Sequence, residues 1–371
     1  MNMHSGKNLF VLTNLDQGGA ETCQLRFVQM LNQDGQYVFC KSGAYGALEK
    51  AYREAGVHLH AFRLGYLGVF SYIRFYFFLR RERFNAICDL TDNFAGIPLF
   101  IAKLARVRVR IAQYLGAENH FKPTFLRRAY NYVVKQLTFR CATKIVANSK
   151  AALDYFYPGI WRDNPKFQVI YNGVDIPKLL SARSDSVKLR EEFGIPSGAF
   201  VVGHTGRYNY AKNHDTIIDV AIRLCRKYPD VYFFLAGLNV DVAYAERVKQ
   251  EGLEGRVIMP GYRNDVPRLL YLMDVFYFPS VTEGQPNSLL EAEIVGLPVV
   301  ASDIAPMKEA VPESFVPKLI PPCDVDCAVN TLEKLYFSRE LRKEYTCQAW
   351  AMENFDGNAR FEEFRKALEC N

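Results

Sequence analysis

The sequence has no hydrophobic run long enough to cross a membrane. Its most apolar stretch, Leu67–Leu79, is interrupted by Arg74 and falls short of the roughly 20 residues that a helical bilayer span needs. The N-terminal residues MNMHSGKNLFVLTN also lack the apolar core and cleavage site of a secretory signal, and their apolar part is typical of a first strand. The sequence therefore predicts a cytoplasmic protein.

The sequence also lacks the spacing of a metal site. The nine cysteines contain no C-x-x-C pair, which favours reduced structural thiols. His58 and His60 alternate along an expected strand, but no third ligand lies close to them in sequence. The D-x-D triplet of Asp324 and Asp326 follows two prolines and opens a helical pattern, which favours a helix N-cap over a metal site. No metal is expected.

Acidic residues are absent between Glu118 and Asp154, although the chain as a whole has a net charge of only +6. Lysines and arginines interleave there with aromatic and aliphatic residues, a pattern that predicts a helix with one apolar and one basic face. A solvated helix face fits this pattern, and so does a surface for anionic lipid headgroups or a diphosphate-bearing substrate. The candidate membrane-facing residues are Arg127, Arg128 and Lys135.

Short β-rich runs alternate with helical patterns in two series, and 371 residues exceed what one core usually organises. The first series is LFVLTN, YVFCKSG, VHLHAF, AICDLT, VRIAQYLG, KIVANS and FQVIYNG, and the second is FVVGHTG, VYFFLAG, RVIMPG, VFYFPS and PVVAS. Such alternation predicts an α/β protein with two Rossmann-like domains, each a parallel sheet covered by helices. We expect domains at 1–174 and 175–345, and a helical tail at 346–371 that packs on the first domain.

Loops after the expected strands carry the candidate binding residues, because open α/β sheets bind ligands at the carboxyl ends of their strands. Two such sheets facing each other would enclose a cleft. The paired glycines Gly18 and Gly19 would let the backbone approach a ligand closely, although a tight strand-to-helix turn explains them as well. The cations Arg207 and Lys212 would bind a diphosphate, although they could also be a pair of surface cations. The turn at Gly261 and Tyr262 could border a nucleotide base.

The stretch TEGQPNSLLEAEIVGLPVVAS places Glu283 in a loop and Glu291 in the helix that follows. The helix is expected to begin near Asn287 or Ser288, both good cap residues, and to end at Gly296. One carboxylate would satisfy the helix dipole. A pair is better explained by hydrogen bonds to the hydroxyls of a sugar or ribose.

The motifs GGAE, GRYNYAKN, YNGVD, PGYRNDV and EGQPNSLLEAEIVGLPVVAS together resemble the retaining GT-B glycosyltransferases of the group-1 type, family 4. The resemblance implies transfer of a sugar from a nucleotide-sugar donor, with UDP ahead of GDP as carrier, with retention and without a metal or other cofactor. It also implies a glycan or lipid-diphosphate-linked acceptor, a setting in bacterial surface polysaccharide assembly, and no nucleic-acid partner. A basic helix would then hold the enzyme on the inner face of the cell membrane.

The resemblance also implies residue roles. Glu283 would contact the donor sugar and Glu291 the ribose, while Arg207 and Lys212 would neutralise the leaving diphosphate. Donor-binding roles fall in addition on Gly18, Gly19, Gly261, Tyr262, Gly284, Asn287, Ser288 and Leu289.

One departure concerns the acceptor. Many relatives carry a histidine in a segment like AHSHNAE, where this chain reads AQYLGAE, residues 112–118. Asp92, Glu118 and His120 are the remaining candidates for the acceptor base. Two other functions stay open: a nucleotide-sugar 2-epimerase of similar layout, and a nucleotide-sugar binding subunit without catalysis.

Overall fold

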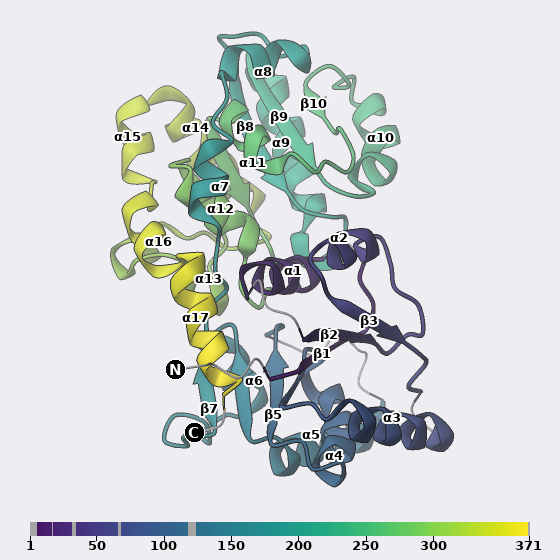
Figure 1. Ribbon diagram of the computed structural model, residues 1–371. Coiled ribbons are helices and arrows are strands. Elements are labelled where there is room, and N and C mark those ends of the chain that lie inside the picture. Colours follow the sequence, from purple (N-terminus) through teal and green to yellow (C-terminus); the bar gives the residue numbers. More distant parts are fainter. Residues whose placement is uncertain (1–5, 17, 32–34, 66–67, 118–123, 370–371) are drawn as a thin grey trace. The chain divides into compact units, whose positions relative to one another are not determined.

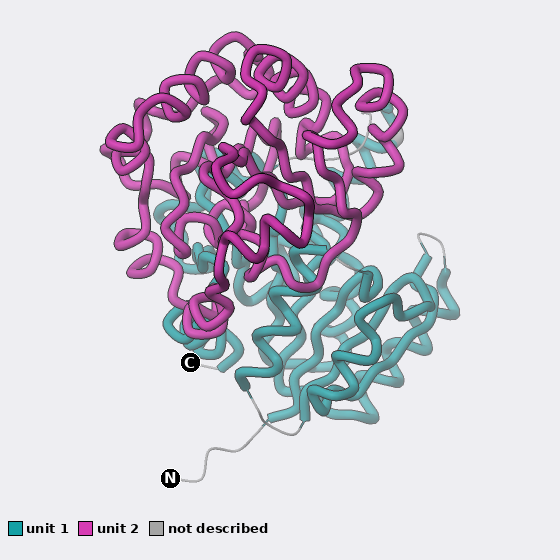
Figure 2. The backbone as a smooth tube through the Cα atoms, turned by 90° about the horizontal axis from the view of Figure 1, so that it is seen from above, with its two compact units in different colours: residues 1–173, 357–371 teal, residues 174–356 magenta. Residues whose placement is uncertain are grey.

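The computed structural model describes residues 6–16, 18–31, 35–65, 68–117 and 124–369 (Figure 1). The chain forms two compact units, unit 1 from Met1–Gly173 and Gly357–Asn371, and unit 2 from Val174–Asp356 (Figure 2). Unit 1 thus ends one residue before the predicted 174, and the chain returns to it at 357 rather than at 346.

Unit 1 contains a seven-stranded sheet in the order β3-β2-β1-β4-β5-β6-β7, in which all neighbouring strands are parallel. Each of the seven runs predicted as a strand forms one. These runs are almost continuously apolar because helices cover both faces of the sheet. The strands are β1 (Asn8–Leu12), β2 (Gln36–Cys40), β3 (His58–Ala61), β4 (Ala86–Asp89), β5 (Val109–Tyr114), β6 (Lys144–Ala147) and β7 (Phe167–Val169).

Two helical layers cover this sheet, each over its own apolar core. One layer contains α1 (Gly19–Leu31), α2 (Glu49–Glu54) and the C-terminal α17 (Gly357–Ala367). The other contains α3 (Val69–Glu82), α4 (Gly96–Leu104), α5 (Phe125–Cys141) and α6 (Lys150–Phe156), with the short η1 (Asp92–Ala95) before α4. Among the described residues, no helix combines the length and the hydrophobicity that a bilayer span requires.

Unit 2 contains a five-stranded parallel sheet in the order β10-β9-β8-β11-β12. The second predicted series accounts for all five strands. They are β8 (Phe200–Thr205), β9 (Val231–Ala236), β10 (Val257–Ile258), β11 (Val275–Phe278) and β12 (Val299–Ala301).

The described helices of unit 2 are α7 (Ile176–Ser181), α8 (Ser186–Glu192), α9 (His214–Lys227), α10 (Val240–Gln250), α11 (Val266–Leu269), α12 (Asn287–Ile294), α13 (Ala305–Ala310), α14 (Val325–Phe337), α15 (Arg339–Glu344) and α16 (Gln348–Asn354). Of these, α9, α10 and α14 contribute buried residues to a third apolar core. Short 3-10 turns lie at η2 (Tyr210–Lys212), η3 (Leu270–Leu272) and η4 (Glu313–Lys318).

The C-terminal segment divides between the units. The Gln348 side chain of α16 donates to the carbonyl of Ile294 in α12, 2.9 Å away, so this helix packs within unit 2. As predicted, the last helix returns to the first domain: the ring of Phe27 in α1 lies 5.7 Å from Phe361 and 4.8 Å from Phe364, centroid to centroid. The predicted tail therefore began too early, because residues 346–356 contribute to unit 2.

The two chain passages between the units lie beside each other. The backbone N–H of Val174 donates to the carbonyl of Phe355 at 2.9 Å. A Cβ atom on Gly173 would lie 2.7 Å from the Cα of Gly357, so only glycine fits at position 173 without displacement of the backbone.

Candidate active site

The carboxyl end of the unit 2 sheet gathers most of the predicted donor residues. The central strand β8 has β9 on one side and β11 on the other. The connections leaving this pair of strands therefore diverge between β8 and β11, which is where open α/β sheets bind their ligands.

A largely buried ion pair spans this point. Lys212, at the end of η2 after β8, places its Nζ 2.6 Å from Oε1 of Glu283, in the loop after β11. The side chains are only 15% and 12% exposed, and the Lys212 Nζ also lies 4.5 Å from the ring centroid of Phe278. Breaking such a pair from one side leaves a poorly solvated charge, so each partner holds the other in place.

The loop that carries the cations is firmly held. A Cβ on Gly237 would lie 1.9 Å from the Gly206 carbonyl oxygen, so the loops after β8 and β9 touch through backbone. Asn209 accepts a hydrogen bond from the Lys212 N–H at 3.0 Å. Arg207 is exposed, and no hydrogen bond or ion pair joins its side chain to another described residue. Its guanidinium is therefore available to an anion.

The helix after Glu283 starts at Asn287, as predicted, but its capping differs from the prediction. Pro286 occupies the N-cap position and provides no side-chain cap, so Asn287 and Ser288 are helical residues rather than caps. The Leu289 N–H donates to the Pro286 carbonyl at 2.9 Å, while no acceptor for the Ser288 N–H is found among the described residues. Gly296 ends the helix with φ +86°, which confirms the prediction.

Two glutamates of α12 are buried. Glu291 is 9% exposed, Leu289 is fully buried, and Gly284 is buried in the preceding loop. Glu293 was not predicted: among the described residues neither of its carboxyl oxygens has a hydrogen-bond partner, and burial raises its pKa well above the usual range. Burial therefore favours the protonated form of Glu293. The sequence alone did not distinguish this residue from Glu291.

The predicted base-bordering turn follows β10. Gly261 has φ +70°, and its carbonyl accepts from the Gly237 N–H at 2.9 Å. Tyr262 is 48% exposed. The turn thus presents an aromatic side chain on a backbone that is tied to the loop after β9.

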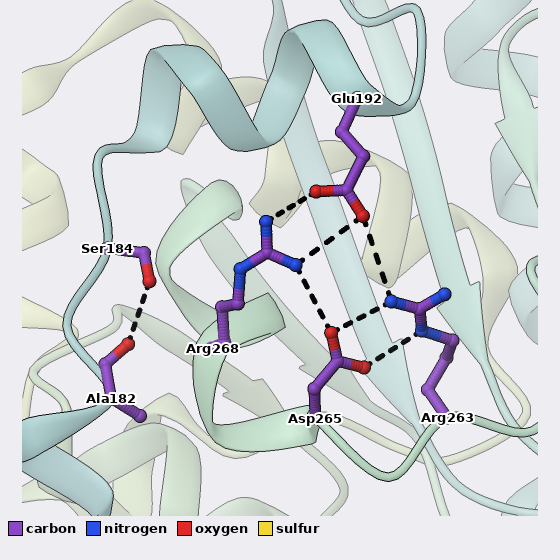
Figure 3. Close-up of polar contacts among 6 residues, drawn as sticks. All are labelled: Ala182, Ser184, Glu192, Arg263, Asp265 and Arg268. Atoms are coloured by element: carbon purple, nitrogen blue, oxygen red, sulfur yellow. Dashed lines mark hydrogen bonds and ion pairs between the residues drawn. The ribbon is translucent and has the colours of Figure 1, made fainter.

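A cluster of charged side chains anchors the next residues (Figure 3). Arg263 donates from Nε and Nη2 to the two oxygens of Asp265, each at 2.8 Å, and Arg268 joins Asp265 to Glu192 of α8. Arg263 holds the pKa of Asp265 below its usual range. The cluster fixes the position of the turn that bears Tyr262.

A buried histidine pair lies beneath the cationic loop and was missed by the sequence reasoning. His204 donates from Nδ1 to the Tyr277 carbonyl at 3.0 Å, and its ring centroid lies 5.0 Å from that of His214. Burial, and then the neighbouring His214, lower the pKa of His204 well below its usual range, and burial lowers the pKa of His214 to about 4. Both rings are neutral near pH 7.

The glycines of unit 1 lie after β1 at the start of α1. The Gly18 carbonyl accepts from the Thr22 N–H at 3.0 Å, and Gly19 is exposed as the first helical residue.

A second buried ion pair lies at the carboxyl end of the unit 1 sheet. Lys41, after β2, places its Nζ 2.7 Å from Oδ2 of Asp89 and 2.6 Å from Oγ1 of Thr91, both after or at the end of β4. The Asp89 side chain is fully buried, and burial lowers the pKa of Lys41, opposed by the charge of Asp89. These residues are far apart in sequence and carry no motif.

Asp92 stands beside this pair in a left-handed conformation, with φ 51°. Its Oδ1 accepts from the Leu115 N–H at 2.8 Å. Burial raises the pKa of Asp92 to about 7, against the hydrogen bonds from the backbone of Leu115 and Gly116. A non-glycine residue with positive φ and a perturbed pKa at a strand end is typical of a functional position. The other two base candidates, Glu118 and His120, lie outside the described residues.

The basic helix is α5, and its outer face mixes charge with apolar side chains. Arg127 and Arg128 are exposed. Lys135 is half-buried, with its Nζ 4.9 Å from the Tyr157 ring centroid and its pKa lowered by burial. The structure therefore presents two of the three predicted cations to solvent. Apolar side chains exposed on the same helix are Phe125, Tyr132 and Val133.

The D-x-D triplet caps a helix, as predicted. Asp324 is the N-cap of α14 and accepts from the Cys327 N–H at 2.8 Å. Asp326 pairs with Arg223 of α9. Both carboxylates thus have structural partners.

Comparison with known proteins identifies the class. Residues 17–178 match the sequence profile of Glycosyltransferase Family 4, and residues 185–350 that of Glycosyl transferases group 1. Anabaena HepE, solved in complex with UDP-glucose, has a TM-score of 0.81 at 24% identity, over 98% of this chain and 99% of that one. Two parallel-sheet units of this kind define a GT-B glycosyltransferase fold.

Curated relatives agree with these matches. UDP-Gal:alpha-D-GlcNAc-diphosphoundecaprenol alpha-1,3-galactosyltransferase of Escherichia coli is 28% identical over 71% of this chain and 70% of its own length. The capsular polysaccharide biosynthesis glycosyltransferase CapH of Staphylococcus aureus is 24% identical over 80% and 81%. The chain belongs to the group-1 glycosyltransferases, family 4.

Proposed function

We propose that the protein transfers a hexose, with retention and without a metal, from a UDP-sugar to a glycan or lipid-diphosphate-linked acceptor in bacterial surface polysaccharide assembly. The observation that carries the proposal is the Lys212–Glu283 pair beside the uncapped start of α12. The choice of UDP and of the setting is supported by relatives named for a UDP-galactose donor and for capsule biosynthesis, and by the UDP-glucose complex of HepE.

The donor chemistry follows from the charges. Breaking the glycosidic bond leaves positive charge on the sugar and negative charge on the diphosphate. Arg207, Lys212 and the Ser288 N–H at the start of α12 stabilise that anion in preorganised positions. Glu283 accepts from a hydroxyl of the donor sugar, and Glu291 from the ribose. When the diphosphate binds, Lys212 forms an ion pair with it, and the Glu283 carboxylate accepts a hydrogen bond from the sugar.

The acceptor chemistry is assigned to unit 1. Asp92, whose pKa is raised by burial to about 7, accepts the proton of the acceptor hydroxyl, while Lys41 and Asp89 keep the surrounding loops in place. The exposed arginines of α5 hold unit 1 to an anionic membrane surface.

The first experiment is calorimetric titration with UDP, GDP and ADP in EDTA, repeated with Glu291→Ala. Binding of UDP that the substitution weakens supports a metal-free donor site. Absence of UDP binding in EDTA, with binding restored by Mg²⁺, contradicts the metal-free proposal. The anomeric configuration of the product, read by NMR coupling constants, tests retention separately.

Two other functions make different predictions. A 2-epimerase would convert the UDP-sugar itself with no acceptor present, and a binding subunit would hold UDP without turnover on any acceptor. Incubation of the protein with UDP-sugar alone, and then with a panel of lipid-diphosphate sugars, distinguishes all three.

Membrane attachment by α5 has its own test. Sedimentation with anionic vesicles should weaken with added salt and with Arg127→Gln and Arg128→Gln together. Lys135→Gln serves as the comparison, because that side chain is half-buried against Tyr157. Equal binding by the wild type and the double variant contradicts a role for α5.

A further inference from the structure

A basic cavity of about 890 Å³ lies in unit 1 at the amino ends of β1, β4 and β5, the edge of this sheet opposite to the one that carries Asp89 and Asp92. It is formed by the ends of α3 and α4, by the residues that precede the three strands, and by the C-terminal Glu369. Its cations are Lys7, Arg80, Arg83, Arg106 and Arg108.

Two of these arginines occupy equivalent positions in successive βα units. Arg83 follows α3 and precedes β4 by three positions (83 to 86), and Arg106 follows α4 and precedes β5 by three positions (106 to 109). β4 and β5 are neighbours, with Ala86 opposite Val109. Adjacent strands lie about 4.8 Å apart, so the two arginines start side by side at the edge of the sheet.

Both arginines have left-handed backbone conformations, with φ 58° at Arg83 and 64° at Arg106. Helices usually place glycine at this position, because a Cβ atom there costs free energy. The chain therefore bears this backbone cost twice, at arginines in two neighbouring loops. Such costs at one place suggest a ligand that offsets them.

Among the described residues, no carboxylate pairs with either arginine. Glu82 lies near the cavity but pairs with Lys7, 3.1 Å from Nζ to Oε2, and Glu369 pairs with an arginine of α17. No hydrogen bond or ion pair in the described part of the chain joins the side chains of Arg83 and Arg106 to a partner. The charges of the two arginines favour an anion in the cavity.

The loops that carry these arginines are rigid. The Arg110 guanidinium donates to the carbonyls of Val107 at 2.6 Å and Arg108 at 3.0 Å, and Arg108 donates to the Asn85 side chain at 3.2 Å. Phe84, after Arg83, is buried in the core, as is Val107. A site built on fixed loops loses little entropy when it binds.

Apolar side chains are exposed on the helices that end at the cavity. Phe77, near the end of α3, is 64% exposed, and Leu104, the last residue of α4, is 52% exposed. Phe70 and Ile73 extend this apolar face along α3, at 87% and 48% exposure. Exposed apolar side chains next to arginines fit a lipid surface, where the rings enter the headgroup region and the cations meet phosphates.

We propose that this cavity binds the phosphate group of an anionic lipid headgroup, with Arg83 and Arg106 as its main donors. None of the residues that line the cavity is a proposed donor residue or an arginine of α5.

The test replaces both arginines by glycine, which favours the left-handed conformation. Arg83→Gly/Arg106→Gly should unfold in urea at the same concentration as the wild type or at a higher one, and should bind UDP equally well. Its partition onto vesicles of phosphatidylglycerol in phosphatidylcholine should fall by about tenfold or more, since each cation near an anionic surface contributes severalfold.

A matched control removes the same charge elsewhere. Arg223→Gln/Arg226→Gln on α9 takes two exposed arginines from unit 2. It should keep vesicle binding near that of the wild type. Equal partition of all three proteins, or equal losses by both variants, overturns the cavity as a specific site.

A second arm separates lipid-borne from free phosphate. Inorganic phosphate, titrated at constant ionic strength, should compete only weakly with vesicles. Saturable binding of inorganic phosphate that the glycine variant abolishes, without any vesicle binding by the wild type, overturns the lipid assignment in favour of a soluble phosphorylated ligand. UDP binding by unit 2 is measured alongside, so failure here is distinguishable from failure of the proposed transfer reaction.

Discussion

The carboxylate of Asp92 accepts a hydrogen bond from the backbone N–H of Leu115, 2.8 Å away, although burial raises its pKa to about 7. The hydrogen bond fixes the carboxylate at the carboxyl edge of the unit 1 sheet, and the raised pKa makes it a base suited to neutral pH.

Asp92→Asn should lower kcat/KM by about 10²- to 10⁴-fold, the usual contribution of a positioned base. In the wild type, kcat/KM should fall as the pH drops below about 7, where Asp92 becomes protonated. Asp163→Asn, an exposed change in unit 1, is the control. A wild-type profile that is flat from pH 8 to about 5 contradicts the role of Asp92 as base.

Asp92→Asn should lower activity but raise the free energy of unfolding at high pH. The folded state holds a proton on Asp92 that the unfolded state has lost above about pH 3.9, so this group lowers stability progressively as pH rises towards its folded pKa of about 7. Asn is as compatible as Asp with the left-handed φ of 51°. Unlike Asp at pH 8, it places no negative charge at this position. At pH 8 the variant should therefore unfold at a higher urea concentration than the wild type, although it is less active.

Lys212→Ala and Glu283→Gln both break one ion pair, so their structural effects are similar. We expect Lys212→Ala to weaken UDP binding and to lower kcat by about 10²- to 10³-fold, as for removal of a preorganised electrostatic group. Glu283→Gln should lower kcat while UDP affinity stays near that of the wild type. Calorimetry with UDP on both variants decides the matter: equal losses of affinity would mean that the pair is only structural.

Asp324→Ala should cost about 1 kcal/mol of unfolding free energy through the lost N-cap of α14. Transferase activity in EDTA should not change. Asp326→Ala, at an 82% exposed side chain, should have little effect on either quantity. If Asp324→Ala abolishes a metal-stimulated activity instead, the D-x-D triplet is a metal site.

Phe361→Ala should destabilise unit 1 by about 3 to 5 kcal/mol, because the ring is 7% exposed and packs against Phe27. Phe70→Ala removes an equal volume from a ring that is 87% exposed, and should leave the urea midpoint unchanged. Equal midpoints for both variants would show that α17 contributes little to the core of unit 1.

Periodicity and turn residues predicted the strands because a buried parallel strand is a local, nearly continuous apolar run. The start of α12 and the left-handed Gly296 were likewise local features. The capping of α12 could not be predicted locally. Pro286 is the N-cap, in a buried loop, and the side chains of Asn287 and Ser288 do not cap the helix.

The electrostatics of the site depended on tertiary structure. Lys212 and Glu283 were each singled out, but only the order of β8 and β11 brings them together. Lys41 and Asp89 carry no motif, and their pairing follows from β2 and β4 flanking β1. Residue propensities favour glycine at a left-handed position after a helix, so they did not predict the left-handed conformations of Arg83 and Arg106.

The hydrogen bond from Val174 to Phe355 makes unit 2 an insertion whose two ends abut. Gly173 and Gly357, which flank it, already touch in unit 1, where Gly173 leaves no room for a Cβ. In topological terms, residues 174–356 are a cassette: both junctions with unit 1 lie at one place, so the segment leaves and rejoins unit 1 without interrupting the strands of its sheet.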